Sequence, residues 1–97
     1  MIVKGIEENY NIENLLGSRA RVRILKLLAK NKELSISQII RNTKLNHTSV
    51  KNHLTYLKSN NLVQEKIFGR IKIYRYKFEN IRAKSLSKFI EIWEGEL

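Results

Sequence analysis

The 97-residue chain contains no cysteine and no proline. Without cysteine it can form no disulfide framework, no thiolate metal site and no cysteine nucleophile. No apolar run approaches the roughly 18 residues of a membrane span. The N-terminus, with Lys4 followed by acidic residues, lacks the pattern of a secretory signal. We therefore expect a cytoplasmic protein with no membrane partner.

Residue patterns of catalysis are also missing. The four glycines are too scattered for a phosphate-binding loop, and no Ser-His-Asp order or apolar pair of carboxylates occurs. The two histidines, His47 and His53, are six residues apart, so they do not share a helix face at the i, i+4 spacing of a metal site. We expect no enzyme activity, no metal and no cofactor.

Acidic residues are rare in the middle of the chain. Between residues 18 and 88 there are 18 lysines and arginines but only three acids, Glu33, Glu65 and Glu79. The other six acids lie in the two end segments, where Lys4 is the one cation. The net charge of +10 attracts polyanions. This distribution indicates that the middle of the chain faces the polyanion and that the ends serve another purpose.

Three stretches carry apolar residues at helical spacing. The first begins after the N-cap Ser18 and runs to about Asn31, which can take a left-handed conformation. The second opens at Ser35 and ends near Asn42. Residues 43–45 form a turn to the third helix.

Asn46 is a good N-cap for the third helix, 47–60, in which Val50, Leu54 and Leu57 form a narrow buried stripe. Residues 60 and 61 are both asparagine, which tolerates positive φ and so ends the helix. Before the first of these helices, Ile12, Leu15 and Leu16 suggest a short helix or turn ended by Gly17.

The apolar period then changes to two. Residues 63–67 and 71–78 predict two strands joined by the turn Phe68-Gly69-Arg70. Both faces of the second strand carry large side chains, which leaves its inner face undecided. A last helix begins at Asn80 or Ile81 and runs to about residue 93.

This order predicts a mainly α protein with a β-hairpin (α+β), a winged helix-turn-helix with a three-helix core, a wing and a C-terminal helix. We divide the chain into an N-terminal extension or short helix (1–17), a DNA-binding domain (18–79) and a dimerisation helix (80–97). A domain of this size buries only roughly 60–65% of its unfolded surface, so a partner subunit would help its stability.

A helix-turn-helix places the first turns of its second helix in the DNA major groove, where short polar and basic side chains read base edges and phosphates. A basic wing tip reaches the neighbouring minor groove or phosphates. His53 is expected to be packed or half-buried. The expected DNA contacts are Ser35, Gln38, Asn46, His47, Thr48, Lys51, Asn52, Thr55, Lys58, Arg70 and Lys72.

Residues 18–78 resemble the winged helix-turn-helix domain of arsenical-repressor-like (ArsR-like) regulators of bacteria and archaea. The matching segments are "SRARVRILKLLAK", "LSISQIIRNTKLNHTSVKNHLTYLKSNNLV" and "EKIFGRIKIYRYKF". The resemblance covers about 61 of the 97 residues, and "HTSVKNHLTYLKSNNLV" is its most specific part. It implies a recognition helix and DNA binding, but no particular target sequence. Metal-sensing members use cysteine, histidine and carboxylate clusters, which this chain lacks.

The C-terminal helix carries an apolar surface that either packs on its own core or pairs with a second copy. We favour a homodimer, because a twofold axis would set two recognition helices about one DNA turn apart, ~34 Å. The predicted interface consists of Ile81, Leu86, Phe89, Ile90 and Trp93.

The sequence therefore predicts a homodimeric regulator of transcription that binds double-stranded DNA sequence-specifically. The alternative is a sequence-tolerant architectural DNA-binding protein or an RNA-binding winged helix, because charge does not distinguish polyanions. RNA readers display aromatic platforms. Phe68, Tyr74, Tyr76 and Phe78 are candidates for one.

Overall fold

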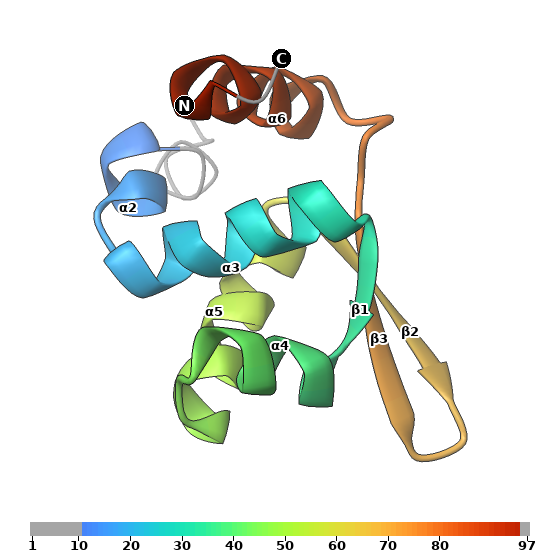
Figure 1. Cartoon of the computed structure of the whole chain (residues 1–97). Helices are drawn as coiled ribbons and strands as arrows, with labels where there is room; N and C mark the ends of the chain where they lie inside the picture. The colour runs from blue at the N-terminus through green and yellow to red at the C-terminus, as the bar shows by residue number, and fades with distance from the viewer. Residues whose placement is uncertain (1–10, 96–97) are drawn as a thin grey trace, which may run out of the picture.

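The computed structural model describes residues 11–95 (Figure 1). Over that range the chain forms five helices and a three-stranded antiparallel sheet. The elements in chain order are α2 (Ile12–Leu16), α3 (Arg19–Asn31), β1 (Glu33–Ser35), α4 (Ile36–Thr43), α5 (His47–Ser59), β2 (Val63–Phe68), β3 (Ile71–Tyr76) and α6 (Ile81–Glu94). The winged helix-turn-helix architecture predicted from the sequence is confirmed.

Each of the longer helices begins at a polar side chain that accepts a hydrogen bond from the first turn. The predicted caps Ser18, Ser35, Asn46 and Asn80 all act in this way. The short helix that ends at Gly17 is also confirmed, with Asn11 as its cap. These caps fix where each helix starts and hence the direction in which it leaves its loop.

The predicted end of α3 at about Asn31 is confirmed, but the residue with the positive φ is Lys32 rather than Asn31. Lys32 has a φ of 72°; its N–H closes the helix on Leu28, and its carbonyl accepts from the N–H of Tyr76. The next predicted helix end, near Asn42, is short by one residue. Thr43 belongs to α4 rather than to the turn, since its hydroxyl donates to the Ile39 carbonyl at 2.7 Å.

The sheet contains a strand that the sequence pattern did not predict. β1 is only three residues long, too short to show a period, and it pairs antiparallel with β3 from Glu33↔Arg75 to Ser35↔Ile73. β3 is therefore the central strand, in the order β1-β3-β2. The hairpin boundaries also shift, since Phe68 ends β2 and β3 stops at Tyr76.

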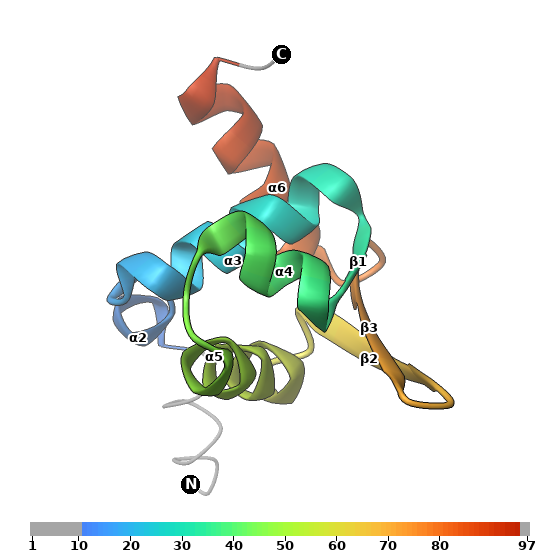
Figure 2. The same ribbon diagram turned by 60° about the horizontal axis from the view of Figure 1, so that its bottom comes forward.

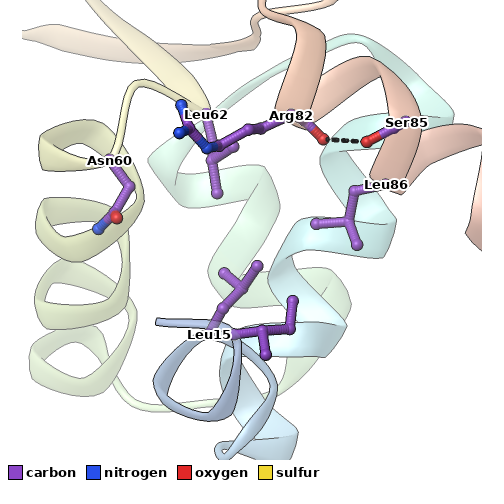
Figure 3. A pocket seen from close by; sticks show the side chains of 7 residues that line it. Leu15, Asn60, Leu62, Arg82, Ser85 and Leu86 are labelled. Atoms are coloured by element: carbon purple, nitrogen blue, oxygen red, sulfur yellow. Dashed lines mark hydrogen bonds between the residues drawn. The ribbon is translucent and has the colours of Figure 1, made fainter. Parts of the chain in front are cut away.

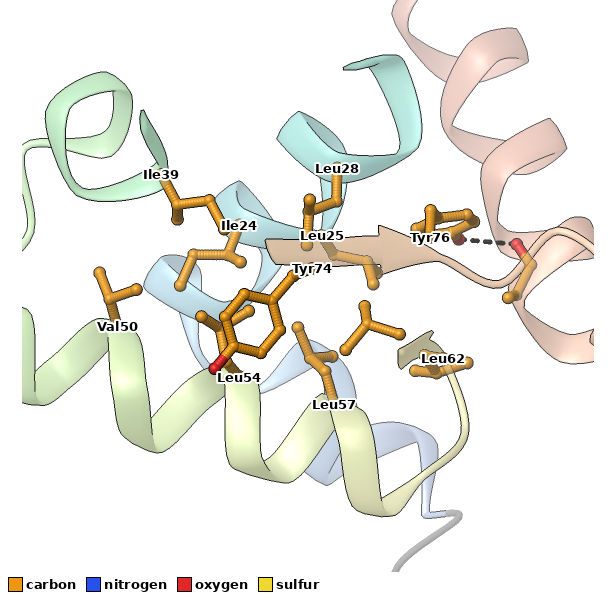
Figure 4. Packing of buried hydrophobic residues seen from close by; sticks show 12 residues of the cluster. Ile24, Leu25, Leu28, Ile39, Val50, Leu54, Leu57, Leu62, Tyr74 and Tyr76 are labelled. Carbon is orange, nitrogen blue, oxygen red and sulfur yellow. Dashed lines mark hydrogen bonds between the residues drawn. The ribbon is translucent and has the colours of Figure 1, made fainter. Parts of the chain in front are cut away.

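The core lies between α3, α5 and the sheet (Figure 4). Ile24, Leu25 and Leu28 of α3 are buried, and the predicted stripe of Val50, Leu54 and Leu57 faces them from α5. The buried side of β3 carries Tyr74 and Tyr76, which settles the inner face of that strand.

The helices occupy two sides of α3. α4 and α5 lie on one side and α6 lies on the other, as the two views agree (Figures 1 and 2). Ala83 and Ser87 of α6 are buried against the rest of the domain. The β2–β3 hairpin extends beyond the helices as a wing. The helix-turn-helix and α6 are thus on opposite sides of the same domain.

One hydrogen bond joins the sheet to α6. The hydroxyl of the fully buried Tyr76 donates to the carbonyl of Ala83 at 2.6 Å (Figure 4). Burial raises the pKa of this phenol, so it stays protonated and able to donate.

We expect Tyr76→Phe to lower the free energy of unfolding by about 1–3 kcal/mol, because the buried Ala83 carbonyl loses its side-chain donor. Tyr74→Phe is the matched control, since its partner Glu65 keeps a lysine ligand, and it should cost less. Urea denaturation at one protein concentration measures both. Equal losses of unfolding free energy in the two variants would show that the hydrogen bond to α6 stabilises the fold no more than the hydrogen bond of Tyr74 does.

A second cluster holds α5 against α2 and α3. The Arg21 guanidinium lies 3.7 Å from the ring centroid of Tyr56 and donates to Nδ1 of His53 at 3.4 Å. It also donates to the Asn14 carbonyl. His53 is half-buried, as predicted, and its pKa is lowered first by burial and then by the charge of Arg21.

This cluster predicts a pH dependence of stability. The pKa of His53 lies below its usual 6.5 only in the folded chain, so protons bind preferentially to the unfolded chain in acid. The contribution of His53 is fully present above that usual value and is lost as the pH falls through the lowered pKa. Melting temperatures between pH 7.5 and 5 should fall less for His53→Gln than for the wild type. His47→Gln controls for loss of an exposed imidazole, and an unchanged slope in His53→Gln would contradict the assignment.

Candidate nucleic-acid interface

α5 presents one polar face to solvent. At 100° per residue, the side chains of this face fall within about 140° of arc around the helix axis. They lie on the side away from the buried stripe. All of them are exposed, and none packs on the core. The predicted contact residues that the structure brings together on this face are His47, Thr48, Lys51, Asn52 and Thr55.

Four predicted contact residues already make hydrogen bonds at helix ends or within a helix. Ser35 and Gln38 form a reciprocal capping box at the start of α4, with bonds of 3.2 and 2.9 Å. The Asn46 side chain accepts from the N–H of Ser49 at 2.8 Å, and Thr55 donates to the Lys51 carbonyl at 2.9 Å. These bonds orient α4 and α5.

Lys58, one of the predicted DNA contacts, forms an ion pair within the chain. Its ammonium lies 3.1 Å from the carboxylate of Glu65, which belongs to β2. The Tyr74 hydroxyl donates to the same carboxylate at 2.6 Å and, with Lys58, lowers the pKa of Glu65. Glu65 thus ties the last turn of α5 to the base of the wing.

Sequence reasoning missed this role of Glu65. The one available signal was its rarity, since it is one of three acids in the basic middle of the chain.

The wing turns through two residues, Gly69 and Arg70. Gly69 has a φ of 60°, which suits the first position of a tight hairpin turn with glycine there. Arg70 is exposed at the tip, and Lys72 follows it on β3. Neither forms an ion pair within 4 Å among the residues that the structure describes, although the charge of Lys72 adds to the lowering of the pKa of Glu65.

The other two strand cations of the wing are paired. Lys66 lies 3.1 Å from the Glu33 carboxylate. Arg75 contacts Glu79 at 2.7 Å, and this bond lowers the pKa of Glu79 to about 2. The positive charge left open on the wing is therefore the pair that the sequence predicted, Arg70 and Lys72.

A further cation stands in the turn between α4 and α5. Lys44 is exposed with a φ of 61°, and its backbone N–H closes α4 on the Ile40 carbonyl. The preceding carbonyl, that of Thr43, accepts from Arg23 of α3 at 2.7 Å. Lys44 was not among the predicted contacts, although a lysine in the turn before the N-terminus of α5 was a signal for it.

A small pocket of about 260 Å³ lies outside this polar face (Figure 3). Leu15, Leu62 and Leu86 form its apolar walls, and the Ser85 hydroxyl donates to the Arg82 carbonyl at 3.1 Å beside it. It touches only the C-cap residue of α5, Asn60. This is roughly 20 Å along the helix axis from His47, at 1.5 Å per residue, so the pocket is separate from the polar face.

Within residues 11–95, no group of three or more histidine or acidic side chains could hold a metal ion. None of the helices described there has the length and apolar character needed to cross a membrane.

Residues 18–65 match the family model described as bacterial regulatory protein, arsR family. No curated protein sequence matches the chain.

Solved structures share the fold over nearly the whole chain. HlyU from Vibrio cholerae is 18% identical with a TM-score of 0.76, covering 96% of this chain and 97% of its own. The transcriptional repressor PagR of Bacillus anthracis is 22% identical with a TM-score of 0.70, covering 89% and 95%. A homodimeric winged helix-turn-helix DNA-binding domain from Mycobacterium bovis is 24% identical with a TM-score of 0.73, covering 99% and 88%.

The family match spans the caps Ser18, Ser35 and Asn46, the helix-turn-helix and the first half of β2. The helix-turn-helix is the part that carries the polar face of α5. Through residues 18–65, the chain belongs to the winged helix-turn-helix proteins of the arsR family.

Proposed function

We propose that this protein is a homodimeric regulator of transcription that binds double-stranded DNA sequence-specifically. The observation that carries the proposal is the exposed polar face of α5, where His47, Thr48, Lys51 and Asn52 stand at the start of a firmly capped helix. The B-DNA major groove, about 12 Å wide, accommodates such a helix.

The side chains on this face suit base and phosphate recognition. Asn52 can bond an adenine edge in two places, while Lys51 and Lys44 can reach guanine edges or phosphates. Arg70 and Lys72 place open charge on the wing, where they can contact the adjacent minor groove or backbone. Lys58 stays a predicted contact, and its ion pair with Glu65 also joins α5 to the wing.

The dimer would form through α6. Phe89 and Trp93 have rings 5.7 Å apart and are 53% and 76% exposed, and Ile81 is exposed as well. A groove of about 260 Å³ separates them from Leu16 of α2, so apolar surface continues from one helix to the other. Leu86 and Ile90, also predicted for the interface, pack in part against the core of their own chain.

Two further points support a dimer on this side. α6 lies across the domain from α4 and α5 (Figure 2), so pairing through α6 leaves the polar face of each copy open. The structurally similar domain from Mycobacterium bovis is described as homodimeric and DNA-binding.

The RNA-binding alternative loses its main support. Tyr74 and Tyr76 are buried and Phe78 packs against the core, so three of the four candidate aromatic residues are unavailable to stack on bases. Phe68 alone remains exposed.

Selection of bound sequences from a randomised duplex pool, with matched RNA as competitor, tests the proposal. A palindromic motif with half-sites about one DNA turn apart is the expected result. Equal binding to all duplexes, or tighter binding to RNA, would contradict it.

We expect Lys51→Ala with Asn52→Ala to weaken binding to the selected duplex by about 10- to 100-fold, since one phosphate or base contact and one bidentate base contact are lost. Both side chains are exposed, so the melting temperature should stay within a few degrees. Lys84→Ala, an exposed lysine of α6, is the control for loss of charge and should bind nearly as the wild type does. Fluorescence anisotropy measures all three, and unfolding of the double variant would instead make these residues structural.

We expect Phe89→Ala with Trp93→Ala to convert dimers to monomers, because the two largest exposed side chains of α6 are removed. Sedimentation equilibrium gives the mass. Phe68→Ala with Ile71→Ala removes comparable exposed apolar surface from the wing and should leave the mass unchanged. A persistent dimer in the α6 variant would assign the interface to another surface.

A further inference from the structure

Exposed large hydrophobic side chains gather at two places in the described part of the chain. Six of the nine lie on α2 and α6, at or beside the proposed dimer surface. The other three lie at the tip of the wing, where Ile67, Phe68 and Ile71 are 62%, 59% and 55% exposed. None of these three packs against the core. The DNA contacts proposed above for the wing use only its cations, so they give these apolar side chains no role.

The strand register places two of them side by side. Phe68 pairs with Ile71, directly across the two-residue turn. Because side chains alternate along a strand, this pair lies on the face of the hairpin opposite the buried Tyr74 and Tyr76. Ile67 pairs with Lys72 on the other face. The tip therefore exposes an apolar pair on one face and Ile67 beside Lys72 on the other.

The charge around the tip restricts what can cover it. Arg70 and Lys72 adjoin the apolar pair and form no ion pair within 4 Å in residues 11–95. Another copy of the same tip would be repelled by like charge. The complementary partner is an anionic surface with an apolar, concave interior, and the DNA minor groove has sugar walls between two rows of phosphates.

The wing is also held in position for such a contact. β3 pairs with β1 and β2 at its base, and Glu65 joins that base to α5 through Lys58 and Tyr74. A hairpin with a fixed direction can press an apolar pair into a groove without first becoming ordered.

We propose that Phe68 and Ile71 form an apolar wedge that enters the minor groove beside the site read by α5, opens one base step and bends the duplex toward the major groove. Arg70 holds the flanking phosphates. This inference rests on the proposed function. It also assigns a specificity role to the wing, because pyrimidine–purine steps open most easily and should be favoured where the wedge enters.

The test uses the selected duplex, with fluorophores at its two ends to report bending and 2-aminopurine at the flanking steps to report unstacking. Wild-type protein should shorten the end-to-end distance and brighten 2-aminopurine at one step per half-site. Phe68→Ala with Ile71→Ala should abolish both signals and weaken binding by roughly tenfold. Its salt slope should not change, because no charge is removed.

Two control variants separate the effect of the apolar wedge from the effect of charge. Phe68→Leu with Ile71→Leu keeps an apolar tip and should retain most of the bend. Arg70→Ala should lower the salt slope by about one unit while leaving the bend. Melting temperatures confirm that each variant folds.

Failure of the wedge and failure of DNA binding give different results. If wild type binds the duplex but the alanine pair leaves bend, 2-aminopurine signal and affinity unchanged, the wedge is wrong and the regulator stands. If wild type selects no duplex, the proposed function itself fails. If wild type binds phosphatidylglycerol vesicles through the same pair while DNA bending is unaffected, the tip contacts a membrane and the wedge is again overturned.

Discussion

The packing of one narrow stripe of α5 onto α3 is the constraint on which the rest of this structure depends. Val50, Leu54 and Leu57 are almost fully buried, and at helical spacing they occupy only one side of the helix. The opposite side must then face solvent along its whole length. Because the buried stripe fixes the rotation of the helix about its axis, it also fixes which side chains can meet a groove.

Orientation of the wing depends on a different kind of contact. The Glu65 carboxylate receives a phenol from β3 and an ammonium from α5, and it is more protected from solvent than Lys58 is. An isolated surface ion pair would contribute little to stability. The Glu65 carboxylate, however, also accepts a short hydrogen bond from the neutral Tyr74 hydroxyl. One of the three acids in the basic middle therefore joins the wing to α5, rather than merely lowering the net charge.

The sequence predicted the helices, their caps and the hairpin because each has a local cause. Ser18, Ser35 and Asn46 cap within three residues of themselves, and the apolar spacing identifies each buried stripe. What could not be predicted depends on partners distant in sequence. β1 exists because β3, some 40 residues later, pairs with it. Likewise, nothing near Lys58 marks it as the partner of Glu65, which is seven residues away and beyond the end of the helix.

A chain of this size leaves apolar surface that its own core does not cover, and where that surface remains is informative. On α6, the buried residues Ala83 and Ser87 are small, Leu86 and Ile90 pack in part against the core, and Phe89 and Trp93 stay exposed, so the largest side chains of the helix face solvent. The reverse arrangement would serve a monomer better. At the wing, Tyr74 and Tyr76 are buried, whereas Phe68 and Ile71, which flank the turn, are exposed. The exposed apolar side chains of α6 and those of the wing tip each lie beside elements whose charge or shape suits a partner. Binding to a partner therefore explains their exposure better than a poorly filled core does.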